Sequence, residues 1–245
     1  GVELGGRRIT KNLKLSCDFY LALGFRIVPK GKDRFPWFKL TDDSTLIFLL
    51  ENGSNYMGYT YFTDNIDSKA KLLKELNIEL VQDSPNEKVF FSPQDLIFTI
   101  VETQNVVDYA FEYKTYMNIP PDDFKDKKML PNEILGAFGE LACHCDNLKN
   151  DIVFYEQLGF KVAHQAETPY PYCIMSDGLN IIGLHNTTDF KHNNITYFAP
   201  DVKDMVEHLE DVGINNITEF TGTGGDENNV VIKTLENQNI FFFKS

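Results

Sequence analysis

The chain carries an internal repeat that spans most of its 245 residues. The phrase Phe-Tyr-x-x-Leu-Gly-Phe occurs at residues 19–25 and again at residues 154–160, which is 135 positions later. Further residues keep nearly the same offset, namely Asn12-Leu13 with Asn147-Leu148, Pro36 with Pro171, Asp42 with Asp177, and Tyr61-Phe62 with Tyr197-Phe198. A repeat of this length indicates a duplicated structural unit, so the chain is expected to fold as two related halves.

A finer repeat lies within each half. Four segments carry apolar or nearly apolar residues at steps of four, three and three: Leu13, Cys17, Tyr20, Leu23; Ile66, Ala70, Leu73, Leu76; Leu148, Ile152, Tyr155, Leu158; and Val202, Val206, Leu209, Val212. This spacing lines one face of an α-helix. A Gly or Asn follows each segment, and these residues tolerate the left-handed conformation just after a helix end. The pattern predicts four helices in two pairs.

Short runs rich in β-branched and aromatic residues flank each predicted helix and indicate strands. Such runs precede three of the helices, at residues 59–63, 140–145 and 195–199, whereas the run before the first helix, at residues 5–10, is weak because of its two glycines. Further runs follow the helices, at residues 35–40, 46–50, 89–91, 96–101, 170–175, 181–184, 230–233 and 240–243. Each quarter of the chain is therefore predicted as a strand, a helix and about three strands, in an α+β fold.

The repeat also predicts the domain organisation. The expected parts are an N-terminal domain at residues 1–104, a connector at residues 105–132 and a C-terminal domain at residues 133–245. The connector lies outside the repeat and contains Pro120-Pro121, and its aromatic residues are expected to pack on the surface of the domains: Tyr109, Phe111, Tyr113 and Tyr116.

Composition excludes several functional classes. The formal net charge of −13 argues against binding to nucleic acid or to anionic membranes, both of which need a basic face. No apolar run approaches the ~20 residues of a transmembrane helix, and no signal peptide is visible. Four cysteines are too few for a disulfide framework, so reduced thiols in a cytoplasmic protein are expected.

Paired strand-helix-strand units with the phrase at residues 19–25 and 154–160 resemble the vicinal oxygen chelate superfamily, which includes glyoxalase I, bleomycin- and fosfomycin-resistance proteins and extradiol dioxygenases. The resemblance covers nearly all of the chain except the connector. It implies four βαβββ modules that form two glyoxalase-like domains, each an open curved mixed sheet with helices outside and a cup for a small-molecule ligand. Some members build their sites across a dimer, so a monomer or a homodimer is expected.

The resemblance also implies a divalent metal held by three residues, two of which begin strands and one of which, commonly Glu, lies on the last strand. In the first half these positions fall on Gly5, Gly58 and Phe98. In the second half they fall on Glu140, Asn194 and Phe242. If the alignment is shifted by one residue along the last strand, the position of the third ligand falls only on Ile97, Thr99, Phe241 or Phe243. The usual His/His/Glu metal site is therefore expected to be absent from both halves, and no cofactor is predicted.

The second cup carries the more promising side chains. Strand alternation places Glu140, Ala142 and His144 on one face, and the resemblance makes this the face that lines the cup. The predicted ligand-binding residues are Glu140, His144, Tyr172, His185, Asn194 and Phe242. Polar groups inside an aromatic pocket are typical of a small-molecule site. The first cup is expected to be mainly apolar, with Ile9, Thr60, Phe62 and Phe98, so function is assigned to the second half.

Three functions remain open on the sequence. The favoured one is a protein that binds a small organic molecule in the C-terminal cup without the usual metal site. The second is a divalent-metal lyase, isomerase or dioxygenase with rearranged ligands, which would be Glu140, His144 and His185. The third is a structural or interaction protein whose cups are filled by their own side chains. Each candidate residue also has a plain structural interpretation, such as a pairing of Glu140 with a neighbouring cation, because a buried carboxylate needs a partner.

Overall fold

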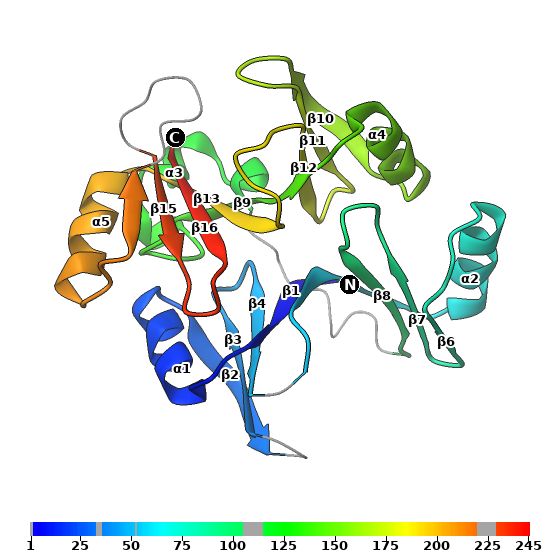
Figure 1. Cartoon of the computed structure of the whole chain (residues 1–245), viewed down its shortest axis with the longest axis horizontal. Helices are drawn as coiled ribbons and strands as arrows, with labels where there is room; N and C mark the ends of the chain where they lie inside the picture. The colour runs from blue at the N-terminus through cyan, green and yellow to red at the C-terminus, as the bar shows by residue number, and fades with distance from the viewer. Residues whose placement is uncertain (1, 33–35, 52, 105–114, 220–228) are drawn as a thin grey trace.

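The computed structural model describes residues 2–32, 36–51, 53–104, 115–219 and 229–245, without the side chains at 2, 3 and 29–32. The chain forms two eight-stranded mixed sheets, one from each half, with helices on their outer faces (Figure 1). The strand orders are β2-β3-β4-β1-β5-β8-β7-β6 and β10-β11-β12-β9-β13-β16-β15-β14. The two orders are the same when the second is renumbered, so the predicted duplication is confirmed in the fold.

Each half contains two βαβββ modules, as predicted. Module 1 contains β1 (Val2–Ile9), α1 (Leu13–Ala22), β2 (Arg26–Lys32), β3 (Pro36–Thr41) and β4 (Leu46–Leu50). Module 2 contains β5 (Tyr56–Thr63), α2 (Ile66–Glu75), β6 (Gln82–Ser84), β7 (Glu87–Phe91) and β8 (Ile97–Glu102). Module 3 contains β9 (Ala137–His144), α4 (Leu148–Gln157), β10 (Lys161–Ala166), β11 (Tyr172–Ser176) and β12 (Ile181–His185). Module 4 contains β13 (Asn194–Ala199), α5 (Val202–Asp211), β14 (Ile217–Glu219), β15 (Val230–Lys233) and β16 (Asn239–Lys244).

Residues 105–114 of the predicted connector, with Tyr109, Phe111 and Tyr113, lie outside the described residues. The rest contains the short helix α3 (Pro121–Phe124) between two 3₁₀ turns, Tyr116–Asn118 and Lys127–Met129. Tyr116 stacks on Phe198 of β13 with 4.2 Å between ring centroids, so this aromatic residue packs on the C-terminal domain as expected.

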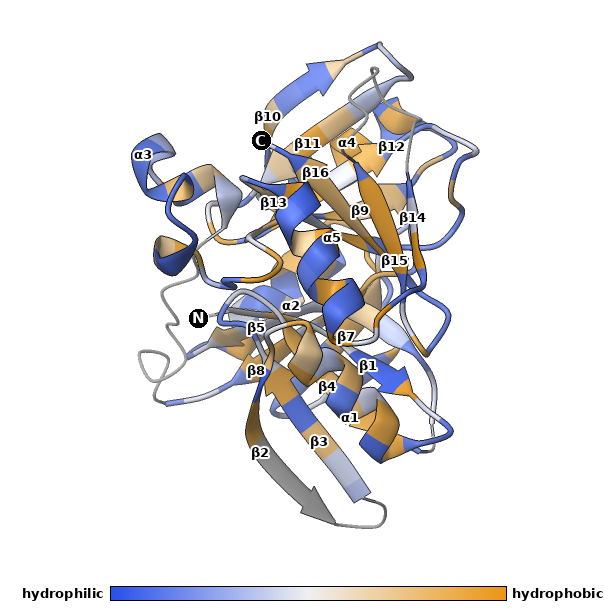
Figure 2. Ribbon diagram, turned by 90° about the vertical axis from the view of Figure 1, so that its left-hand side faces the viewer, coloured by the Kyte–Doolittle hydropathy of each residue, from blue (hydrophilic) through white to orange (hydrophobic). Residues whose placement is uncertain are grey.

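The four long helices share one design. An Asn or Asp side chain caps each start by accepting a hydrogen bond from a backbone N–H three residues later; the caps are Asn12, Asn65, Asn147 and Asp201. The residue just beyond each end has a positive φ, as predicted, at Gly24, Asn77, Gly159 and Gly213. The apolar stripe of each helix packs on its sheet, and α5 shows a hydrophilic outer face above this stripe (Figure 2). Among the described helices, none has the length and apolar character needed to cross a membrane.

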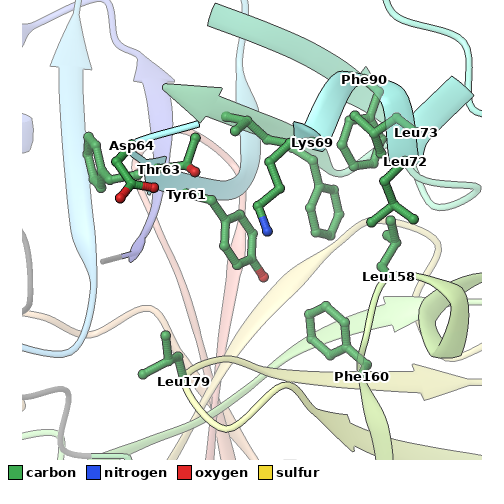
Figure 3. Close-up of a pocket in the computed structure, with 13 residues that line it drawn as sticks. Tyr61, Thr63, Asp64, Lys69, Leu72, Leu73, Phe90, Leu158, Phe160 and Leu179 are labelled. Atoms are coloured by element: carbon green, nitrogen blue, oxygen red, sulfur yellow. The ribbon is translucent and has the colours of Figure 1, made fainter. Parts of the chain in front are cut away.

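Modules 2 and 3 pack against each other across the two halves. Tyr61 and Leu72 of module 2 face Leu158 and Leu179 of module 3 (Figure 3). The Tyr61 hydroxyl donates to Asp177 Oδ2 at 2.6 Å. The hydroxyl of Tyr155, which belongs to the repeated phrase, donates to Gln94 Oε1 at 2.8 Å in the turn between β7 and β8.

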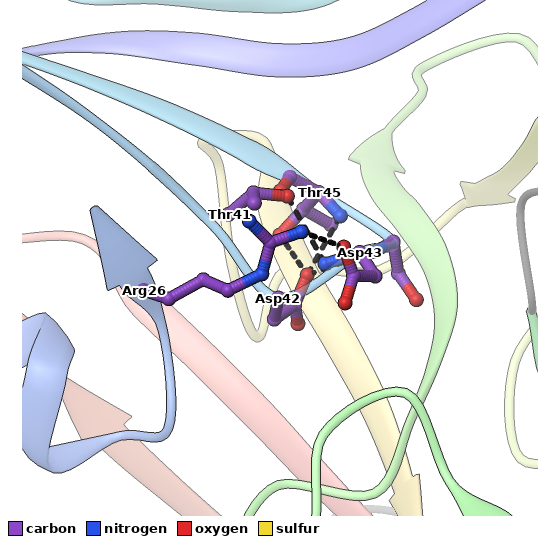
Figure 4. A network of polar contacts seen from close by, with 6 residues as sticks. Arg26, Thr41, Asp42, Asp43 and Thr45 are labelled. Carbon is purple, nitrogen blue, oxygen red and sulfur yellow. Dashed lines mark hydrogen bonds and ion pairs between the residues drawn. The ribbon is translucent and has the colours of Figure 1, made fainter. Parts of the chain in front are cut away.

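Modules 1 and 4 make the corresponding contacts. The Tyr197 hydroxyl donates to Asp42. The other oxygen of this carboxylate accepts the backbone N–H groups of Ser44 and Thr45 within the turn (Figure 4). The Tyr20 hydroxyl donates to Glu236 Oε2 at 3.0 Å in the turn between β15 and β16. Burial raises the pKa of the Asp42 carboxyl, although its hydrogen bonds oppose this shift. Three pairs of residues that match across the repeat therefore join the two halves: Tyr20 and Tyr155, Asp42 and Asp177, and Tyr61 and Tyr197.

Candidate ligand-binding site in the C-terminal cup

A buried carboxylate–imidazole pair lies on the cup face of the second sheet. Glu140 comes from the middle of β9, and His185 ends the neighbouring parallel strand β12. His185 Nε2 lies 2.8 Å from Glu140 Oε1, and each side chain is only 10% exposed. A hydrogen bond of this length holds both groups in one orientation.

The pair depends on a glycine in β12. A Cβ at Gly183 would lie 2.2 Å from Glu140 Oε2 and 2.5 Å from His185 Nε2, both far inside van der Waals contact. Any larger residue at this position would displace one member of the pair. Gly183 therefore provides the space in which Glu140 and His185 meet.

Aromatic rings enclose the imidazole of His185. The Tyr172 ring stacks on it with centroids 5.7 Å apart and an interplanar angle of 12°. Tyr170 and Phe190 approach it at steep angles, with centroid distances of 5.8 and 5.6 Å. Burial raises the pKa of the Tyr170 hydroxyl to about 12, and the nearby Glu140 carboxylate acts in the same direction. The pair thus lies in an environment that excludes water.

One atom of this cluster has no partner. His185 Nδ1 is buried and receives no hydrogen bond from the described residues. A buried polar atom without a partner costs about 1–3 kcal/mol. When Nε2 donates to the carboxylate, Nδ1 carries a lone pair on the neutral ring or a second N–H on the charged ring. A hydroxyl group satisfies Nδ1 in both cases, because it both donates and accepts.

Side chains of the protein fill other parts of the cup. Phe190, from the loop after β12, packs against Ala142 and Phe241 on the cup face. At the far end, Tyr116 and Phe124 of the connector pack with Phe198 and Ala137. Along β9, Glu140 lies between Ala137 and Ala142, so the Glu140–His185 pair lies between these two packed groups.

His144 and Asn194, two other predicted site residues, do not join the Glu140–His185 pair. His144 donates from Nδ1 to the Thr187 carbonyl at 2.7 Å, and its Nε2 lies 3.2 Å from Asp146 Oδ1. Asn194 is 2% exposed and donates from Nδ2 to the His192 carbonyl at 2.6 Å. Both side chains therefore hold loops next to the cup, whereas Tyr172 belongs to the aromatic wall of the pair.

The predicted placement of Phe242 in the cup is wrong. Phe242 is fully buried on the opposite face of the sheet and stacks on Tyr197. In β16 the residues opposite Thr196 and Phe198 are Phe241 and Phe243, and these share the cup face. Phe98 was expected in the first cup and is likewise in the core, 2% exposed. Sequence reasoning missed Phe190 and Gly183, although an isolated glycine within a strand pattern is a signal of close approach.

The donor set does not fit the three-residue metal site that the resemblance implies. Glu140 and His185 engage each other, and His144 donates to a backbone carbonyl rather than joining them. Within the described parts of the chain, no three His, Cys, Asp or Glu side chains gather as a metal site would require. A site of the two-His, one-carboxylate type needs three converging donors. The rearranged set Glu140, His144 and His185 is thus not brought together.

A separate cavity of about 460 Å³ lies between modules 2 and 3 (Figure 3). Its walls are mainly apolar, with Leu72, Phe98, Leu158, Phe160 and Leu179. Among the described residues that line it, only Asp64 and Lys69 carry charge. Burial and the Asp177 carboxylate raise the pKa of Tyr61 far above its ordinary value, so its hydroxyl stays a donor to Asp177.

Solved structures with the same fold are glyoxalases and extradiol dioxygenases. The Mn(II)-bound glyoxalase from Novosphingobium aromaticivorans is 17% identical, with 99% of this chain and 80% of that chain covered and a TM-score of 0.62. Homoprotocatechuate 2,3-dioxygenase from Arthrobacter globiformis is 12% identical, with 99% and 78% covered and a TM-score of 0.64. A catechol 2,3-dioxygenase is 14% identical, with 99% and 91% covered and a TM-score of 0.60.

At these identities the likeness establishes the fold alone. Comparison of the sequence with protein-family models gives no match, and neither does comparison with curated proteins. The chain therefore has the two-domain fold of glyoxalases and extradiol dioxygenases, as the resemblance of its repeat predicted.

Proposed function

We propose that the protein binds a small organic molecule at the Glu140–His185 pair of the C-terminal cup, without a three-residue metal centre. The observation that carries this proposal is the buried pair itself, with His185 Nδ1 lacking a partner among the described residues. A buried polar pair of this kind seldom stabilises a fold more than well-packed apolar residues would, which supports a role in ligand binding.

The surroundings of the pair favour a hydroxylated aromatic ring as the ligand. The rings of Tyr170, Tyr172 and Phe190 offer stacking and edge contacts around His185. A ligand hydroxyl would supply the missing partner of Nδ1. The names of the dioxygenases of the same fold, which act on catechol and homoprotocatechuate, point in the same direction. The ring of Phe190 is buried against His185, so entry of a ligand ring at this face of the imidazole requires a change in the position of Phe190.

The test is a titration with catechol, followed through the imidazole signals in ¹H–¹³C NMR spectra. The chain has five histidines, so individual assignment by substitution is practical. We expect a saturable shift of the His185 signal that disappears in Glu140→Leu. His208→Gln, on the exposed side of α5, is the matched control and should bind catechol normally. A His185 signal that does not respond to catechol would contradict the proposal and favour a purely structural cup.

The second candidate function is a divalent-metal enzyme with rearranged ligands, because a glyoxalase of this fold carries Mn(II). The experiment is metal analysis after purification in metal-supplemented medium. We expect less than one metal ion per chain, with no effect of His144→Ala. Stoichiometric metal that is lost in both Glu140→Ala and His144→Ala would establish the enzyme instead.

The proposal also covers the oligomeric state and the cellular compartment of the protein. The pair and the rings around it belong to the same chain, which supports the proposal that a monomer binds the ligand. The four cysteines are free and buried, and burial raises the pKa of Cys145 to about 12 and that of Cys173 to about 11. Such thiols are inert at neutral pH, which supports a reducing compartment such as the cytoplasm.

A further inference from the structure

The N-terminal cup carries a row of alternating cationic and aromatic side chains. Lys39 lies opposite Phe48 across β3 and β4, Phe48 opposite Arg7 across β4 and β1, and Arg7 opposite Tyr56 across β1 and β5. The row thus crosses four neighbouring strands in the order Lys39, Phe48, Arg7 and Tyr56. Neighbouring strands lie about 4.8 Å apart, so the two cationic residues are roughly 10 Å apart at their backbones. In the sheet, their backbone positions lie on either side of Phe48.

The floor beside this row lacks side chains. Gly5 and Gly58 lie directly opposite each other across β1 and β5. Neither position has room for a Cβ, which would lie 2.6 Å from the Leu46 carbonyl at Gly5 and 1.8 Å from the Ile97 carbonyl at Gly58. A cavity of about 260 Å³ lies over this floor, and its lining includes Arg7, Lys39, Phe48, Tyr56 and Thr60. Its volume suits a ligand smaller than a drug-sized molecule.

Arg7 has unused capacity for hydrogen bonds. Its guanidinium carbon lies 5.1 Å from the centroid of the Tyr56 ring, so the ring supports the cation from one side. Its Nε is buried and has no partner among the described residues. Within the described part of the chain, no carboxylate forms an ion pair with Arg7. In a chain of net charge −13, a guanidinium that lines a cavity and forms no ion pair with a described residue is a candidate for anion binding.

We propose that the N-terminal cup binds a small aromatic carboxylate. The Arg7 guanidinium offers the planar fork of N–H groups that pairs with a carboxylate, and Lys39 adds positive charge on the other side of Phe48. The rings of Phe48 and Tyr56 provide the apolar surface for the aromatic part of the ligand. The anion supplies a partner for the buried Nε of Arg7.

The proposed site is independent of the Glu140–His185 pair. The repeat aligns Gly5 with Glu140 and Phe48 with Gly183, so the two cups place their large side chains on different strands. The first cup therefore presents cations and rings where the second presents a carboxylate and an imidazole. The two sites should accept ligands of different charge.

The experiment uses benzoate as the probe and the fluorescence of Trp37 as the signal. Trp37 is the single tryptophan of the chain, and it stacks on Phe48 with 5.1 Å between centroids and an interplanar angle of 23°. We expect a saturable fluorescence change with benzoate and binding at least tenfold weaker with benzyl alcohol, which has the same ring without the charge. Raising the salt concentration from 50 to 500 mM should weaken benzoate binding, as expected for a partly exposed ion pair.

Variants decide whether the contacts are those proposed. Arg7→Gln should lower benzoate affinity at least tenfold, and Arg7→Lys should lower it less, because it keeps the charge and loses the fork. The Glu140→Leu/His185→Leu variant should bind benzoate as the unmodified protein does, which separates this proposal from the one for the C-terminal cup. Equal benzoate affinity in Arg7→Gln would overturn the proposal, and so would inorganic phosphate that binds as tightly as benzoate.

Discussion

A double-mutant cycle on the Glu140–His185 pair tests whether it serves binding rather than folding. The three variants are Glu140→Leu, His185→Leu and the combination of both. Each single substitution leaves one polar partner buried, since each side chain is 10% exposed. Loss of a buried hydrogen-bond partner costs about 1–3 kcal/mol, and about 3–5 kcal/mol when the remaining group is charged. We therefore expect a loss of about 2–4 kcal/mol in the free energy of unfolding for each single variant.

The combined variant should be far less affected than the sum of the two. It removes both polar groups, and it also removes the buried Nδ1 of His185, which already lacks a partner among the described residues. The repeat places Leu50 at the position of His185, so the fold accepts a leucine there. We expect the combined variant to lie within about 1 kcal/mol of the unmodified protein, which gives a coupling energy of about 3 kcal/mol or more.

The assay is urea unfolding followed by circular dichroism, with midpoints compared at constant slope. The catechol titration is repeated on the combined variant, which should be folded and unable to bind. Losses that simply add in the combined variant would refute the reasoning, because they would mean that each residue stabilises the protein through separate contacts. A combined variant that is stable and still binds catechol would refute the assignment of the site.

Three other substitutions, one of them with a control variant, test single contacts. Gly183→Ala should lower the free energy of unfolding by about 1–3 kcal/mol and abolish catechol binding, because the new Cβ displaces the buried pair. Urea unfolding measures the first effect and the NMR titration measures the second. Tyr155→Phe leaves Gln94 Oε1 buried without its partner and should lower the free energy of unfolding by about 1–3 kcal/mol. Tyr116→Phe is the control, because the hydroxyl contact of Tyr116 is exposed. This control should change the free energy of unfolding by less than about 0.5 kcal/mol in the same assay. Asp42→Asn tests a pH dependence. Burial raises the pKa of the Asp42 carboxyl in the folded protein. The protonated carboxyl therefore stabilises the unmodified protein below the ordinary pKa of about 3.9, and this contribution is lost as the pH rises through the folded-state pKa. The Asn variant should therefore gain stability relative to the unmodified protein between pH 4 and pH 7, and a constant difference over this range would contradict the shift.

The sequence was sufficient for the fold because the fold depends on periodic patterns. The 4-3-3 spacing, with Gly or Asn after it, marks the core face and the end of each helix, and both properties are local. Even the weak run at residues 5–10 became the central strand β1, because β4 and β5 pair with it on both sides. Neighbouring strands can thus override poor local propensity.

The sequence was less informative about the site because the site depends on register and on loops. A shift of one residue moves a side chain to the other face of a sheet, and this places Phe242 in the core while Phe241 faces the cup. Phe190 comes from a loop whose path no periodicity encodes. The meeting of Glu140 with His185 requires knowledge that β9 and β12 are neighbours.

The duplicated sequence records how the halves are joined more faithfully than what each half binds. Asp42 and Asp177 match in the repeat, and each accepts a hydrogen bond from the matching tyrosine of the other half, Tyr197 or Tyr61. The cup positions have instead diverged. Glu140 lies against Gly183 in the C-terminal half, whereas the repeat places Gly5 and Phe48 at the same two positions of the N-terminal half. In the C-terminal half, the small residue Gly183 makes space for Glu140 on the neighbouring strand. Placing a glutamate and a histidine at the matching positions of the N-terminal cup, without also introducing the glycine that matches Gly183, should therefore fail to create the C-terminal site there.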